Sequence, residues 1–265
     1  MRKATRIVAI TLALMAAACS SSNSRTTSPG GGTTKLTVFA ASSLTGAFTQ
    51  IGIDFEASNS GTTVDFNFGS STDLAAQIAS EGTADVFASA SGKAMDAVQA
   101  KPGVTGRTDF ATNQLVIVTP ANDPGGVSSM QDLTKPDVKL VLAAVGVPVG
   151  DYARQALTNA GILDAATANV VSDEQDDASV LAKVASGEAD AGIVYTSDVS
   201  TAASSGTHVR SVDIPAALNV TATYPIAVVT GATRSAAAQA FVAYVTGSSG
   251  QATLKTFGFG PPPAG

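Results

Sequence analysis

Residues 36–44 read Leu-Thr-Val-Phe-Ala-Ala-Ser-Ser-Leu, an apolar run that ends in two serines and opens into a stretch of helical period. Residues 66–74 follow the same pattern as Phe-Asn-Phe-Gly-Ser-Ser-Thr-Asp-Leu. Each stretch predicts a β-strand that turns through small hydroxyl residues directly into a helix. We therefore expect an α/β fold in which serine side chains stand at helix N-termini.

Short β-rich runs alternate with helical stretches along the rest of the chain, which is typical of α/β layers around a mostly parallel sheet. The predicted strands are residues 36–40, 63–68, 86–89, 115–119, 140–143, 191–195, 209–213 and 226–229. The predicted helices are residues 44–56, 73–80, 151–160, 178–185 and 236–244. Composition marks no linker in the middle of the chain, so this pattern alone does not divide it into lobes.

A third turn, Gly-Val-Pro-Val-Gly-Asp at 146–151, also precedes a predicted helix and leaves the amides of Val149 and Gly150 without regular partners. In the first turn either Ser42 or Ser43 stands at the helix N-cap. One capping serine contributes only about 1 kcal/mol to stability and indicates no function by itself. Several helix N-termini directed at one cleft would, however, form an anion site of backbone N–H groups, hydroxyls and aligned dipoles.

Composition excludes several classes of function. The 265 residues include one cysteine, Cys19, and one histidine, His208, which rules out a disulfide framework and leaves too few ligands for a zinc or iron–sulfur site. A formal charge of −6 argues against binding to nucleic-acid phosphates. No G-x-S-x-G motif occurs, and Ser91-Gly92-Lys93 is followed by alanine, which excludes a phosphate-binding loop.

The N-terminus has the features of a bacterial export signal. Three basic residues precede the uncharged twelve-residue run Ile7–Ala18, which is too short to span a bilayer. The sequence Ala-Ala-Ala-Cys at 16–19 resembles a lipoprotein lipobox, with alanine where leucine is usual. We expect residues 1–18 to be a signal peptide and residues 19–34 to be a lipidated Cys19 with a flexible tether. The alternative is a plain secretory peptide with an incidental cysteine.

Loss of the three basic leader residues changes the formal charge from −6 to about −9. The predicted mature protein is thus acidic and is held at the outer face of the cell membrane.

Residues 173–177, Asp-Glu-Gln-Asp-Asp, lack the glycine and the distal glutamate of a calcium loop and predict a helix N-terminus instead.

Four motifs together closely resemble the periplasmic molybdate-binding proteins, which are the solute receptors of molybdate ABC transporters: LTVFAASSL at 36–44, FGSSTDLAAQI at 68–78, VPVGDYARQAL at 147–157 and GEADAGIVYTSD at 187–198. The resemblance runs from about Lys35 to Phe259. It implies a type II periplasmic binding protein fold, in which two α/β lobes are joined by two crossover strands and the ligand lies in the cleft between them. It places lobe 1 at residues 35–114 plus 223–265 and lobe 2 at residues 115–222.

The resemblance also implies the ligand-binding residues. That family holds its tetrahedral oxyanion with two serine hydroxyls, a tyrosine hydroxyl and backbone amides, and uses no cationic side chain. Matched residue by residue, these donors fall on Ser43, Ser71 and Tyr195 and on the amides of Val149 and Asp177. Molybdenum is then bound only as the oxyanion, with no protein ligand to the metal itself, and neither a cofactor nor a catalytic residue is expected.

Asp177 departs from the small apolar residue that is common at its position in that family. A carboxylate beside a dianion repels it, so we expect the Asp177 side chain to turn outward to solvent at its helix start. An inward carboxylate would suit a protonated ligand such as hydrogen phosphate. Phosphate is therefore the alternative ligand.

The predicted function is high-affinity extracytoplasmic binding of molybdate, with tungstate as a second ligand, and delivery to a membrane permease. We expect a monomer that binds no nucleic acid and is not an enzyme. The alternatives are a receptor for phosphate or sulfate, a purely structural surface lipoprotein, and a serine-dependent hydrolase. In the hydrolase Ser43 or Ser71 would be the nucleophile, with His208 as its base.

Overall fold

The structure is a computed structural model and describes residues 33–264. The predicted signal peptide, Cys19 and the tether up to residue 32 lie outside the described residues. Within this part of the chain, no helix is both long enough and apolar enough to cross a membrane.

Strands and helices alternate along most of the described chain. The strands are β1 Thr34–Ala41, β2 Thr62–Gly69, β3 Val86–Ala88, β4 Val104–Pro120, β5 Leu140–Ala143, β6 Val170–Glu174, β7 Ala191–Tyr195, β8 Val209–Asp213 and β9 Thr221–Val229. The α-helices are α1 Thr45–Ser58, α2 Ser71–Glu81, α3 Gly92–Ala100, α4 Pro148–Asn159, α5 Leu163–Thr167, α6 Asp177–Ala185, α7 Thr196–Ser204, α8 Ser235–Thr246 and α9 Ser248–Thr256. Two 3₁₀-helices, η1 Ser42–Leu44 and η2 Met130–Thr134, complete the set.

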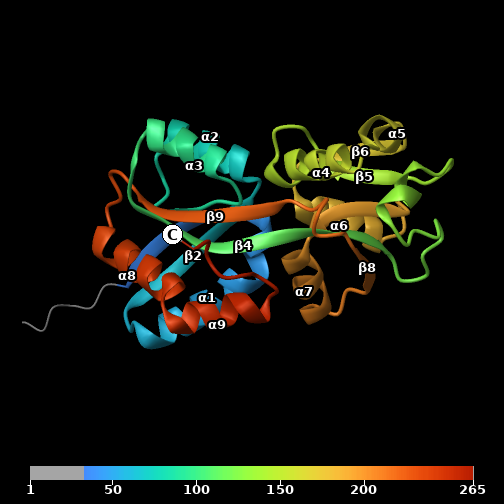
Figure 1. Cartoon of the computed structure of the whole chain (residues 1–265). Coiled ribbons are helices and arrows are strands. Elements are labelled where there is room, and N and C mark those ends of the chain that lie inside the picture. The colour runs from blue at the N-terminus through green and yellow to red at the C-terminus, as the bar shows by residue number, and fades with distance from the viewer. Residues whose placement is uncertain (1–32, 265) are drawn as a thin grey trace, which may run out of the picture. The chain divides into compact units, whose positions relative to one another are not determined.

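The long antiparallel strands β4 and β9 join two halves of one sheet. The first half has the order β2-β1-β3-β9-β4, in which β1 pairs in parallel with β2 and β3. β4 pairs with β9 as far as Gln114 and with β7 from Leu115 onward. The second half continues as β4-β7-β5-β6, and β8 also pairs with β4. Each half with its helices forms an α/β lobe, and β4 and β9 connect the two lobes (Figure 1).

Helices cover both faces of the first half of the sheet. α2 and α3 pack together on one face, and α1, α8 and α9 pack together on the other (Figure 1). Because successive side chains of a strand point to opposite faces, Leu36 and Val38 of β1 pack in the core beside α1 and α8, whereas Phe39 packs in the core beside α2 and α3. A strand buried on both faces explains the continuous apolar run that opens residues 36–44.

The sequence prediction is confirmed for three strands residue by residue, because residues 140–143, 191–195 and 209–213 are β5, β7 and β8. It is wrong for β4, which begins at Val104 and not at Leu115. Two irregularities in the pairing of β4 with β9 interrupt the alternation of side chains between the two faces of the strand. A regular alternation would have identified residues 104–114 as part of β4. β6, α3, α5, α7 and α9 were not predicted.

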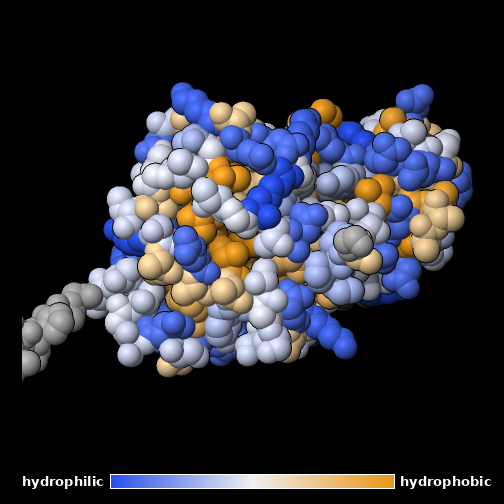
Figure 2. Space-filling model, turned by 60° about the vertical axis from the view of Figure 1, so that its left-hand side comes forward, coloured by the Kyte–Doolittle hydropathy of each residue, from blue (hydrophilic) through white to orange (hydrophobic). Residues whose placement is uncertain are grey.

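Hydrophilic residues cover most of the face that Figure 2 shows, and hydrophobic residues gather mainly in one recess of the first lobe. Among residues 33–264, the large hydrophobic side chains that stand well out into solvent are Ile53, Val145 and Val171. These three come from α1, from the turn after β5 and from β6, so they are scattered along the chain. The apolar residues therefore serve mainly to stabilise the core.

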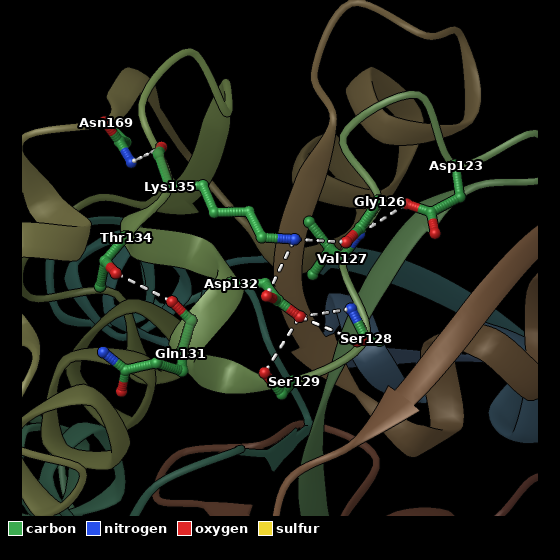
Figure 3. A network of polar contacts seen from close by, with 10 residues as sticks. All are labelled: Asp123, Gly126, Val127, Ser128, Ser129, Gln131, Asp132, Thr134, Lys135 and Asn169. Carbon is green, nitrogen blue, oxygen red and sulfur yellow. Dashed lines mark hydrogen bonds and ion pairs between the residues drawn. The ribbon is translucent and has the colours of Figure 1, made fainter.

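Asp132 organises the loop that follows β4 (Figure 3). Its carboxylate accepts hydrogen bonds from the Ser128 amide at 2.9 Å and the Ser129 hydroxyl at 3.0 Å, and it pairs with Lys135 Nζ at 2.9 Å. The hydrogen bond from Lys135, followed by those from Ser128, holds the pKa of Asp132 well below its ordinary value. Asp132 therefore ties the first turn of η2 to the two residues that precede it.

We expect Asp132→Ala to lower the free energy of unfolding by about 1–2 kcal/mol at neutral pH, because it leaves the Ser128 amide and the Ser129 hydroxyl without their acceptor. The folded-state pKa of Asp132 is depressed, so its contribution is present above about pH 4 and is lost as the pH falls through that lowered pKa. Urea denaturation of both proteins at pH 7 and at pH 2 measures this, and the difference in stability between them should be smaller at pH 2. The exposed Asp213 provides the control, since Asp213→Ala should change stability little at either pH.

Candidate functional site

A small cavity lies between the two lobes. The first lobe lines it with Ala41, Ser42, Ser70, Ser71 and Ala90, and the second lobe lines it with Val147, Pro148, Val149, Asp177 and Tyr195. The volume open to the centre of a water-sized sphere is about 10 Å³. Pockets for drug-sized organic ligands measure about 300–1,000 Å³, so in this closed arrangement the cavity is far too small for such a ligand.

Four helices begin at the cavity wall. Ser71 is the first residue of α2, Pro148 of α4 and Asp177 of α6, and Tyr195 immediately precedes α7. The first N–H groups of a helix have no acceptor within it and carry the positive end of the helix dipole. Four such ends around one small space make an anion site.

Hydroxyl groups in the wall are available to a ligand. Ser71 Oγ accepts the Ala90 amide at 2.9 Å, which leaves the hydroxyl proton of Ser71 free to be donated. Ser70 Oγ and the Tyr195 hydroxyl are buried and have no hydrogen-bond partner in the protein. Burial raises the pKa of Tyr195 well above its ordinary value, so this phenol stays a neutral donor. Because buried hydroxyls are nearly always paired, both are candidate ligand donors.

None of the residues that line the cavity is a lysine, arginine or histidine. His208 is exposed, immediately precedes β8 and is not part of the wall. Across residues 33–264, no three His, Cys, Asp or Glu side chains lie close enough together to hold a metal ion. An anion in this cavity would therefore be held by backbone amides and neutral hydroxyls.

The η1 turn places Ser42, and not the predicted Ser43, in the cavity wall. The Ser43 hydroxyl lies 2.9 Å from the Tyr224 hydroxyl instead. Neighbouring residues of a 3₁₀-helix point about 120° apart, so the two serines face different surroundings. The resemblance selected Ser43 and passed over Ser42 and Ser70. The signal that could have found them is the Ser-Ser doublet in each turn.

The other predicted residues, Ser71, Val149, Asp177 and Tyr195, all line the cavity. The expected outward orientation of the Asp177 side chain is wrong, because this residue is only 5% exposed. Its Oδ1 accepts a hydrogen bond from the Ser42 hydroxyl, and its Oδ2 is buried without a partner. The reason lies one residue earlier: Asp176 caps α6 by accepting the Ser179 amide at 2.8 Å, which leaves Asp177 free to face the cavity.

A second buried carboxyl group, that of Asp198 on α7, is coupled to Asp177. Asp198 accepts the Tyr195 amide at 2.8 Å. Burial and the adjacent charge of Asp177 raise the pKa of Asp198 well above its ordinary value. Burial also raises the pKa of Asp177, although hydrogen bonds from Asp198 and Ser42 oppose this. Two coupled carboxyl groups cannot both ionise freely, so the pair favours sharing a proton.

Contacts across the cavity hold the lobes together. Besides the Ser42–Asp177 hydrogen bond, Thr72 Oγ1 donates to the Gly146 carbonyl at 2.6 Å. Lys93 Nζ lies 3.8 Å from an Asp151 carboxylate oxygen, but both side chains are exposed and the pair contributes little. The structure is therefore a closed arrangement of the two lobes.

A sequence model of the bacterial extracellular solute-binding proteins matches residues 36–260. The chain belongs to this family. In such a fold, ligands bind beyond the carboxyl ends of the sheet strands. The cavity of this solute-binding protein has that position, because Ala41 ends β1, Tyr195 ends β7, and Ser70 follows β2 directly.

Individual relatives agree with this assignment. The chain is 44% identical over 229 residues to "Molybdate-binding protein ModA" of Mycobacterium tuberculosis H37Rv, a match that covers 86% of this chain and 85% of that protein. It is 36% identical over 238 residues to the protein of the same name from Escherichia coli K12, covering 85% and 88%. The periplasmic molybdate-binding protein of Azotobacter vinelandii superimposes with a TM-score of 0.75 over 86% of this chain and 100% of that one, at 24% identity. The predicted two-lobed binding-protein fold is confirmed.

The first turn of α4, which carries the Val149 amide, packs closely against the end of β5. A Cβ atom on Gly150 would lie 2.4 Å from the carbonyl oxygens of both Ala143 and Ala144, so only glycine permits this approach. We expect Gly150→Ala to lower the free energy of unfolding by about 1–3 kcal/mol, as overpacking does.

Urea denaturation tests this expectation, with Gly92→Ala as the matched control. Gly92 also stands at a helix start, but the nearest atom to its Cβ would be the end of the flexible Arg107 side chain at 3.6 Å. The control should be neutral or slightly stabilising, because alanine favours helix over glycine. Equal stability of the two variants would contradict the steric argument.

Proposed function

We propose that this chain is an extracytoplasmic receptor that binds molybdate, with tungstate as a second ligand, and hands it to the permease of an ABC transporter. The observation that carries the proposal is the convergence of four helix N-termini and unpartnered hydroxyls on one small cavity. The relatives named as molybdate-binding proteins support the choice of anion.

Both lobes supply donors in this proposal. The first lobe contributes the Ser71 hydroxyl and the η1 turn, where Ser42 lines the cavity and the resemblance selects Ser43. The second lobe contributes the Val149 amide and the Tyr195 hydroxyl. Each hydrogen bond to a charged oxygen contributes about 1.5–3 kcal/mol. A set of such bonds, after the cost of ordering and closure, is consistent with micromolar or tighter binding.

The neutral donor set also explains selectivity. Molybdate is fully ionised at neutral pH and donates no hydrogen bond, so a wall made almost entirely of donors suits it, with the Asp177 carboxyl as the exception. Sulfate has the same charge and shape but shorter bonds to oxygen. We infer that cavity size, and not a difference in chemistry, discriminates against sulfate.

The same arrangement favours a binding protein over an enzyme. A serine hydrolase needs a base within hydrogen-bond reach of its nucleophile. His208 is exposed and outside the cavity wall, and Ser71 Oγ is bonded to a backbone amide. We further propose that Cys19 carries a lipid that holds the receptor, as a monomer, at the outer face of the cell membrane.

Phosphate is the second candidate ligand, and the buried Asp177 carboxyl in the cavity wall is the observation that favours it. A thermal shift screen with molybdate, tungstate, sulfate and phosphate separates the candidates. A ligand that binds only the folded state stabilises it by about 2.7 kcal/mol at a hundred times its dissociation constant. Stabilisation by phosphate alone would overturn the assignment to molybdate.

We expect Ser71→Ala and Tyr195→Phe each to weaken molybdate binding roughly tenfold to a hundredfold, because each removes one donor to a buried oxyanion. Isothermal titration calorimetry measures the change. The matched control is Tyr244→Phe, which removes a phenol from α8, outside the cavity wall, and should leave the affinity unchanged. Wild-type affinity in both site variants would place the ligand elsewhere.

Molybdate should also favour closure of the lobes. Because the donors are divided between the lobes, the anion contacts all of them only when the cleft is shut, and it stabilises the closed form by this difference in affinity. We expect solution scattering to show a smaller radius of gyration on addition of molybdate or tungstate, and little change with sulfate. Scattering curves that superimpose with and without saturating molybdate would refute ligand-driven closure.

A further inference from the structure

Asp177 is the one lining residue of the cavity with a carboxyl side chain. Its Oδ2 atom is buried and has no partner within the protein, while its Oδ1 is occupied by the Ser42 hydroxyl. An ionised carboxylate here would place a negative charge against the bound anion in a region of low dielectric. Such a like-charge contact is strongly unfavourable unless a cation or a proton intervenes.

No cation is in place to intervene. The titratable groups and hydroxyls that surround Asp177 are Asp176 at the start of α6, Asp198 on α7, Ser42 on η1, Tyr195 on β7, Tyr224 on β9 and, next to Tyr195, Tyr152 on α4. Every one of them is acidic or neutral. Lys183, the cation on α6, is engaged with Glu174 on β6 at 2.9 Å. A proton is the remaining means of neutralising Asp177.

We propose that Asp177 binds the oxyanion in its protonated form, so that the receptor takes up one proton from solvent with each fully ionised anion and shares it within the Asp177–Asp198 carboxyl pair. This inference rests on the proposed function. It assigns to Asp177 a role as side-chain donor through Oδ2, where sequence matching assigned only its backbone amide.

The proton balance follows from the geometry of the pair. Before the ligand enters, the pair shares one proton, and one oxygen of Asp198 is fixed by the Tyr195 amide. When the anion enters, a second proton moves from water to Asp177, so both carboxyl groups are neutral and Oδ2 becomes a donor like the rest of the wall. When the anion leaves, that proton returns to water.

Proton uptake makes affinity depend on pH. Where the unliganded pair holds a single proton, the dissociation constant for molybdate should rise tenfold for each unit of pH, because one proton is taken up per anion. Calorimetric titration of the wild-type protein with molybdate between pH 6.5 and 8.5, in two buffers of different ionisation heat, counts the protons directly. Molybdate itself stays fully ionised over this range, so any uptake belongs to the protein.

Asp177→Asn provides the decisive variant. The asparagine amide is a permanent donor of nearly the same shape, so proton uptake should fall to zero and the dissociation constant should become independent of pH. The matched control is Asp176→Asn, which removes the neighbouring charge and keeps the cap of α6, because Asn and Asp cap equally well. This control should still take up close to one proton per molybdate.

The outcomes separate the two proposals. Molybdate binding by the wild-type protein without proton uptake, and with one dissociation constant throughout this pH range, would overturn the role of Asp177 and leave the proposed function intact. Absence of any molybdate or tungstate binding would overturn the proposed function itself. The wild-type proton count needs no variant, so the test stands even where Asp177→Asn fails to fold.

Discussion

The convergence of the starts of α2, α4, α6 and α7 on one small cavity is the feature on which the rest of this structure depends. Each of these helices follows a strand, β2, β5, β6 or β7, that ends near the cavity. Buried amides without an acceptor are unfavourable, and four positive helix ends facing one another repel. An anion between them removes both penalties at once. In the proposed function, the anion is therefore the group that favours the closed lobe arrangement.

The site is tied to the crossover strands by one buried side chain. Asn113 on β4 donates to Ser197 Oγ at 2.8 Å and accepts the Thr196 hydroxyl at 2.7 Å, so it holds the first turn of α7 against the strand that connects the lobes. Asp198 in the same turn binds the Tyr195 amide. Tyr195 is thus linked to β4, a strand that connects the lobes. The hydrogen bonds of Asn113 and Asp198 form a continuous path of contacts from the cavity to β4.

Much of the fold was predictable because several of its strands, such as β5 and β7, are buried on both faces. Continuous apolar runs at 140–143 and 191–195 admit few other structures, and both are strands in full. The prediction failed where tertiary contacts override local preference. α7 reads Thr-Ser-Asp-Val-Ser-Thr-Ala-Ala-Ser, a poor helix former on composition, and it is stabilised by the Asp198 cap and by packing on β7 and β8. β6 has only two apolar residues at its start, and parallel pairing with β5 completes it.

The positions of the cavity-lining residues were predictable from their turns, but their directions were not. Nothing local distinguishes Ser42 from Ser43, or decides that Asp176 caps α6 while Asp177 faces inward. That choice changes the chemistry, because a wall of neutral donors selects a ligand by its charge, whereas a wall with one titratable member selects the ligand and a proton together. The overall negative charge of the protein does not alter this, since charges beyond about 8 Å are largely screened at physiological salt. Specificity is therefore set by a few buried groups, and one carboxyl among them is enough to make it depend on pH.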